Sequence, residues 1–147
     1  MTVEELRERY EDPEAIAVFE ERAAQCTGQA RLVRRIEGER VCLFGFSNGN
    51  NPGTIVDDPD DPEEGHHFAV LDGRFIVDPW MHSMSLDGKE AIGRAVFDLA
   101  DPEDAGVVAA CYGDRSTWVR LEDHERGADR ESLPAFFAGG ATRSPGP

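Results

Sequence analysis

Three residues between positions 26 and 78 have the side chains that a thiol enzyme needs. Cys26, His67 and Asp78 follow one another in that order. A cysteine thiolate is a strong nucleophile, and a neighbouring histidine can accept and return its proton. A carboxylate can hold that imidazole in the required tautomer and stabilise its protonated form. These residue types predict a Cys-His-Asp triad, provided that the elements carrying them bring them together.

A β-hairpin is predicted for the segment HHFAVLDGRFIVDPW, which begins at His66. Its two apolar runs flank Asp72 and Gly73, a pair that is a strong signal for a tight turn. If these two residues form a two-residue turn, His67 lies directly opposite Asp78, and opposed residues share one face with Cβ atoms about 4.5–5.5 Å apart. A longer turn would place His66 opposite Asp78 instead, so the choice between the two histidines stays open.

Cys26 is predicted to lie near a break between two helical patterns. Apolar residues recur at helical spacing after Pro13, and a second such pattern runs from Ala30 to Ile36 before Gly38. The amides and the dipole at the start of a helix stabilise negative charge, and a nearby imidazolium lowers a thiol pKa further. This position therefore favours a thiolate, and the same amides could form part of an oxyanion hole.

The pattern resembles the papain-like/transglutaminase-like superfamily of thiol enzymes. The resemblance rests on the helix-start cysteine in QCTGQARLVRRI, on HHFAV, on the DGR turn and on VDPW, and it covers Gln25 to Trp80. It implies a nucleophilic Cys26, a general base at His67 and an orienting Asp78. The implied activity is acyl transfer from an amide, as in a peptidase, a deamidase or a transglutaminase-like enzyme acting on a protein or peptide.

A zinc site is the main chemical alternative to the triad. His66, His67, Asp78 and His82 lie close together in the sequence, and zinc accepts such ligands. Adjacent histidines of a strand point to opposite faces, however, so both cannot readily bind one ion. We therefore predict neither a metal nor another cofactor.

The remaining cysteines indicate a reducing compartment. Cys42 lies in an apolar strand pattern and Cys111 in an apolar helix pattern, and there is no Cys-x-x-Cys pair. An odd number of three cysteines argues against a disulfide framework. The charged N-terminal segment does not look like a signal peptide, and no apolar run approaches the roughly 18 residues of a membrane span. We expect a cytoplasmic protein, with leaderless secretion left open.

The charge of the chain constrains its partners. Thirty acidic residues face fifteen basic ones, which gives a net charge of −15. Nucleic-acid phosphates and anionic membranes would be repelled, whereas a basic protein or peptide would be attracted. A non-catalytic acidic binding module on the same fold is therefore the second functional hypothesis, and the oligomeric state is left open.

The order of the predicted elements indicates one α+β domain over residues 1–138. Helical patterns come first, and strands are then predicted at 40–46, on both sides of the turn in the hairpin, at 95–99 and at 117–121. A further helix is expected over 102–112, a long loop over 47–65 and a disordered tail over 139–147. We expect the N-terminal helices to pack on an antiparallel sheet, and the resemblance implies a papain-like/transglutaminase-like core.

Overall fold

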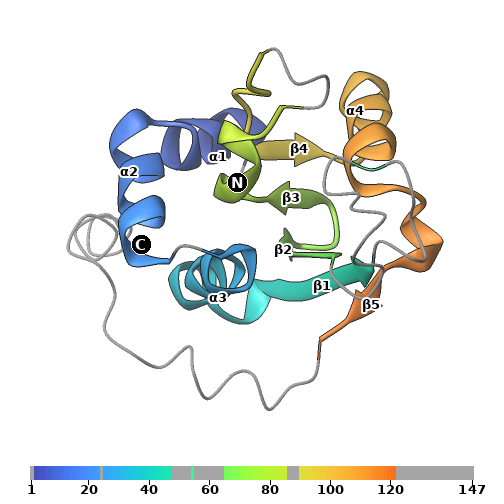
Figure 1. Cartoon of the computed structure of the whole chain (residues 1–147), viewed down its shortest axis with the longest axis horizontal. Coiled ribbons are helices and arrows are strands. Elements are labelled where there is room, and N and C mark those ends of the chain that lie inside the picture. Colours follow the sequence, from blue (N-terminus) through green and yellow to red (C-terminus); the bar gives the residue numbers. More distant parts are fainter. Residues whose placement is uncertain (1, 24, 48–53, 55–64, 86–89, 122–147) are drawn as a thin grey trace.

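The computed structural model of the chain describes residues 2–23, 25–47, 54, 65–85 and 90–121 (Figure 1). The predicted tail and most of the predicted loop over 47–65 lie outside these residues. The elements follow one another as α1 (Val3–Tyr10), α2 (Pro13–Arg22), α3 (Cys26–Glu37), η1 (Gly38–Arg40), β1 (Val41–Ser47), β2 (Gly65–Leu71), β3 (Phe75–Val77), η2 (Pro79–Ser83), β4 (Val96–Asp98), α4 (Pro102–Tyr112), η3 (Arg115–Thr117) and β5 (Val119–Arg120).

Within the described residues, four α-helices accompany a five-stranded sheet with the order β4-β3-β2-β1-β5. Every neighbouring pair of strands is antiparallel. This arrangement confirms the predicted α+β class with an antiparallel sheet. None of the helices described is both long enough and apolar enough to cross a bilayer.

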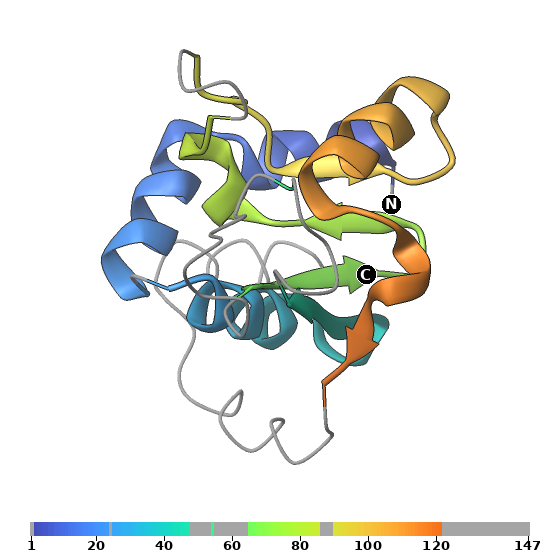
Figure 2. The same cartoon turned by 45° about the vertical axis from the view of Figure 1, so that its right-hand side comes forward.

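The sheet separates two hydrophobic cores. One face packs against α1, α2 and α3, with Leu6, Phe19 and Val33 among the buried contacts. The other face packs against α4, where Val108 and Tyr112 meet the strands. Because side chains alternate along a strand, successive residues of β2 belong to different cores. Figure 2 shows α2, the start of α3 and η2 gathered at one end of the strands.

Local sequence signals explain where three of the helices begin. Thr2 forms a capping box with Glu5 at the start of α1. Asp12 and Asp101 cap α2 and α4, and each is followed by proline at the first helical position. The helix α3, whose first residue is Cys26, begins without a side-chain cap.

The hairpin between β2 and β3 contains one more residue than a two-residue turn requires. Asp72 and Gly73 form the predicted turn with positive φ angles of 55° and 67°, and the amide of Arg74 donates to the carbonyl of Leu71. The ladder nevertheless pairs Leu71 with Phe75 and leaves Arg74 out. The predicted register, which set His67 opposite Asp78, is therefore wrong by one residue.

The extra residue is held by the neighbouring strand β4. The guanidinium of Arg74 donates two hydrogen bonds of 2.9 Å to the carboxylate of Asp98. The backbone carbonyl of Arg74 accepts a hydrogen bond from the amide of Leu99. When the ladder is continued past Ala69 and Val77, Phe68 falls opposite Asp78. The expectation that a longer turn would set His66 directly opposite Asp78 is therefore also wrong. His66 lies two residues before Phe68 on the same face, which turns His66 rather than His67 toward Asp78.

Candidate active site

His66 and Asp78 form a buried pair at the end of the hairpin. Nε2 of His66 lies 2.6 Å from Oδ2 of Asp78, and the two side chains are 0% and 3% exposed. Asp78 follows β3 directly, and its amide donates to the carbonyl of Ala95. The expectation that His67 contacts this carboxylate is corrected here, since His66 takes that place.

Cys26 lies beside this pair at the first position of α3. Its Sγ accepts a hydrogen bond of 3.4 Å from the backbone amide of His67, and its thiol interacts with the side chain of His66. Nδ1 of His66 is buried and has no hydrogen-bond partner among the described residues. It is thus the ring nitrogen left available to the thiol. The structure brings together Cys26, His66 and Asp78, in the order predicted but with the other histidine.

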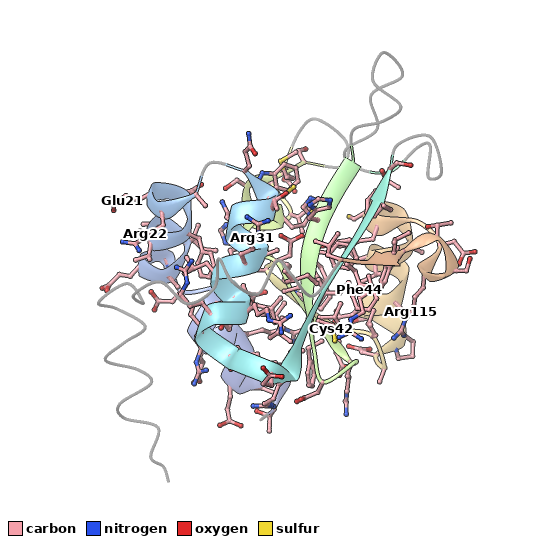
Figure 3. All side chains as sticks on the ribbon, turned by 90° about the horizontal axis from the view of Figure 1, so that it is seen from below. Glu21, Arg22, Arg31, Cys42, Phe44 and Arg115 are labelled. Carbon is pink, nitrogen blue, oxygen red and sulfur yellow. The ribbon has the colours of Figure 1, made fainter. Side chains whose placement is uncertain are left out.

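His67 occupies a different place at the same site. Its Nδ1 lies 2.7 Å from Oγ1 of Thr27, which joins β2 to the first turn of α3. The ring packs over Gly45 on β1. Burial, the positive charge of His66 and that of Arg31 on α3 (Figure 3) lower the pKa of His67, which favours its neutral form. His67 therefore contacts the Cys26 thiol through its backbone amide and contacts Thr27 through its ring.

The electrostatics of the site favour a thiolate next to an imidazolium. Burial alone would lower the pKa of His66, but the charge and the hydrogen bond of Asp78, together with the interaction with Cys26, raise it to about 9. Burial likewise opposes ionisation of Cys26, yet the interactions with His66 and the amide of His67 lower the pKa of its thiol overall. Each member of the pair thus stabilises the charged form of the other.

The start of α3 adds to this stabilisation. Its N-cap residue, Gln25, makes no side-chain hydrogen bond to the helix, and its first turn contains no acidic residue. The other three α-helices described each begin with a side-chain cap and have acidic residues in the first turn. No carboxylate of its own helix therefore competes with the Cys26 thiolate for the positive end of the dipole.

Aromatic rings enclose the imidazole of His66. The ring of Trp80 lies 4.6 Å from it, and those of Tyr112, Phe68 and Phe46 lie at 5.7, 5.8 and 6.2 Å between centroids. Such a wall keeps water from the ion pair and strengthens the interaction between its charges.

Tyr112 is a site residue that the sequence analysis did not identify. Its hydroxyl donates a hydrogen bond of 2.6 Å to Oδ2 of Asp78, the oxygen that also meets His66. A buried tyrosine usually has a hydrogen-bond partner. The apolar helix pattern ending at Tyr112 therefore indicates that its hydroxyl has a hydrogen-bond partner. The pattern does not show which residue that partner is.

The other two cysteines lie outside this arrangement. Cys111 is fully buried on α4, and burial together with the charge of Asp78 raises the pKa of its thiol to about 11. Cys42 is half-buried on β1 (Figure 3). In the part of the chain that the structure describes, all three cysteines are free, and no three His, Cys, Asp or Glu residues are placed to hold a metal ion.

The absence of a side chain at Gly45 makes room for His67. A Cβ atom there would lie 2.4 Å from Cδ2 of His67 and 3.2 Å from the carbonyl oxygen of His66. We expect Gly45→Ala to lower the free energy of unfolding by about 1–3 kcal/mol through overpacking. Gly106→Ala is the matched control, because nothing lies within 4 Å of the added methyl group on α4. This control should stabilise the protein by about 0.5–1 kcal/mol. Urea unfolding measures both, and equal effects of the two substitutions would contradict the packing argument.

Comparison of the chain with protein-family models, curated proteins and solved structures found no match in any of the three. A function therefore has to be argued from the arrangement of Cys26, His66 and Asp78 itself.

Proposed function

We propose that the protein is a thiol-dependent acyl-transfer enzyme that acts on an amide bond. Cys26 is the nucleophile, His66 the general base and acid, and Asp78 the orienting residue. The observation that carries the proposal is the buried His66–Asp78 pair, whose second ring nitrogen is unpartnered within the described residues and whose imidazole interacts with the Cys26 thiol. A buried histidine held by a carboxylate and adjacent to a low-pKa thiol is the arrangement that nucleophilic catalysis by cysteine requires.

The chemistry follows from these positions. The Cys26 thiolate attacks the amide carbonyl carbon, and the carbonyl electron pair moves to oxygen, where the amides at the start of α3 can stabilise it. The His66 imidazolium then gives its proton to the leaving nitrogen as the C–N bond breaks, which leaves a thioester on Cys26. Water or an amine attacks this thioester, His66 accepts the proton of the attacking group, and the thiolate is released. Water gives hydrolysis and an amine gives transamidation.

The order of elements supports assignment to a papain-like/transglutaminase-like core. The cysteine begins a helix, the histidine lies on a following strand, and an aspartate before a proline directly follows the next strand. Within this proposal the base is His66, because the register of the hairpin turns that residue toward Asp78.

The charge of the chain points to a basic substrate. At −15 the protein attracts a basic polypeptide and repels nucleic acid and anionic membranes. The site also depends on a reduced thiol, which a cytoplasmic environment would maintain. We therefore propose a basic protein or peptide as the acyl donor, acceptor or both.

Alkylation of the native protein with iodoacetamide between pH 4 and 9, followed by mass spectrometry, tests the nucleophile. We expect Cys26 to react fastest near neutral pH, because its pKa is lowered, and Cys111 to react slowest, because it is buried with a pKa of about 11. If Cys26 instead titrates as an ordinary thiol, near its reference pKa of about 8.5, the enzyme proposal fails and a non-catalytic binding role replaces it.

A glutamine-containing basic peptide tests the reaction. Ammonia release in water, and hydroxamate formation when hydroxylamine is added, report hydrolysis and transfer from the same thioester. Cys26→Ala should abolish both reactions, whereas Cys42→Ala, which removes a half-buried thiol on β1, should leave them intact. Peptide-bond cleavage in the same sample distinguishes a peptidase from a deamidase. Turnover that survives in Cys26→Ala would exclude the proposed nucleophile.

A further inference from the structure

Tyr112 connects the last turn of α4 to the proposed triad. Its side chain is 0% exposed, and its hydroxyl lies 2.6 Å from Oδ2 of Asp78. That oxygen also receives Nε2 of His66 at 2.6 Å. One carboxylate oxygen therefore accepts from two side chains, one on β2 and the other on α4.

The surroundings of Tyr112 hold its hydroxyl in this position. Its ring packs edge-to-face on Phe68 with centroids 4.8 Å apart, and its carbonyl accepts a hydrogen bond of 3.0 Å from Nε1 of Trp118. Burial and the charge of Asp78 raise the pKa of Tyr112 well above its usual range. The hydroxyl thus stays protonated and donates to Asp78 at every pH relevant to the site.

We propose that Tyr112 is a positioning residue for the triad, which fixes the Asp78 carboxylate and, through it, directs Nδ1 of His66 to the Cys26 thiol. This inference rests on the proposed function for its catalytic meaning. A hydroxyl that donates to a carboxylate also takes up part of its negative charge. Tyr112 should therefore weaken the hold of Asp78 on the His66 proton and ease its transfer to a leaving group.

Tyr112→Phe removes the hydroxyl and keeps the ring. We expect the pKa of His66 to rise above its present value of about 9 by about one unit. The reason is that a hydrogen bond to a charged group contributes a free energy comparable to that of one pKa unit. Nuclear magnetic resonance of the labelled imidazole measures this value directly. The titratable groups around His66 are Cys26 from α3, its neighbour His67 on β2, Asp78 after β3, Tyr112 from α4 and, behind Asp78, Cys111. Recording the titration in a Cys26→Ser background removes the coupling to the thiol.

The chain offers a closely matched control. Tyr10 is also 0% exposed, and its hydroxyl donates to a carboxylate, that of Glu37, at 2.5 Å. It belongs to the core on the other face of the sheet. Tyr10→Phe makes the same chemical change away from the site, so it should leave the titration of His66 unchanged even if it lowers stability to a similar extent.

A second measurement keeps the inference testable if Tyr112→Phe does not fold. The chain has only two tyrosines, so 3-fluorotyrosine incorporated into Tyr10→Phe modifies Tyr112 alone. The fluorinated hydroxyl is a stronger donor and should lower the pKa of His66. The positioning role would be overturned if the pKa of His66 changed neither in Tyr112→Phe nor in the protein that carries 3-fluorotyrosine at position 112. Because the titration requires no turnover, this result is distinct from failure of the proposed function, which an ordinary Cys26 thiol in the alkylation assay would reveal.

Discussion

His66→Ala is expected to slow alkylation of Cys26 at pH 7 by about tenfold or more, since each unit of thiol pKa changes the thiolate fraction about tenfold in this range. Burial and the charge of Asp78 both raise the pKa of Cys26, and the interactions with His66 are the main influences that lower it. Without the imidazole, the amide of His67 and the start of α3 still favour the thiolate. Mass spectrometry of the alkylated protein gives the rate for Cys26 separately from those of the other cysteines.

His67→Ala is the matched control for this experiment. It removes the ring and its contact with Thr27 but keeps the backbone amide that donates to Cys26. The rate for Cys26 should therefore change far less than in His66→Ala. His66→Gln can still donate to Asp78, so we expect it to stay folded. An unchanged circular dichroism spectrum together with slow alkylation would show that the slow reaction does not arise from unfolding. Equal losses in the alanine variants of the two histidines would contradict the assignment of the base.

Asp78→Asn is expected to lower the free energy of unfolding by about 3 kcal/mol at pH 6, and by progressively less toward pH 9. In the folded protein the charge and the hydrogen bond of Asp78, together with a smaller contribution from Cys26, raise the pKa of His66 from 6.5 to about 9. A raised histidine pKa means that the folded state binds the proton more tightly than the unfolded chain. The stabilisation is thus fully present below about pH 6.5 and is lost as the pH rises through about 9.

Urea unfolding of both proteins from pH 5.5 to 9.5 measures this difference. Cys26→Ser serves as the common background, because a lowered thiol pKa contributes to stability with the opposite pH dependence. In Asp78→Asn burial becomes the dominant influence on His66, and its imidazole should be neutral at pH 7. A stability difference that is the same at pH 6 and pH 9 would show that the loss is one of packing and not of the ion pair.

The sequence predicted the elements well where local signals are strong. The helix over 102–112 coincides with α4, which Asp101 caps and Pro102 begins. The strands at 95–99 and 117–121 are shorter in the structure, as β4 and β5. The sequence analysis did not predict α1, in which the described contacts bury only Leu6 and Tyr10. Two buried side chains in eight residues give little periodicity to recognise.

The site was harder to predict, because its decisive contacts join distant segments. The Asp72–Gly73 turn forms as predicted, but Arg74 is not paired in the β2–β3 ladder. It binds Asp98 instead, 24 residues further along the chain. No local pattern reveals that competition, and one residue of offset turns each histidine to the opposite face. The hydrogen bond from Tyr112 to Asp78 spans 34 residues and depends on how α4 packs on the sheet.

The Cys26 thiol and the surroundings of His66 lie on elements that pack on opposite faces of the sheet. Cys26 begins a helix packed on one face of the sheet, whereas the aromatic residues around His66 lie on the other. The thiol meets the imidazole of His66 at the start of β2. Partial opening of the N-terminal helices would therefore separate the Cys26 thiol from an imidazole that remains in place. For the proposed enzyme, this means that the thiolate can be lost through local fluctuation while most of the sheet stays folded, so that the lifetime of the active form is set by the less stable of the two layers.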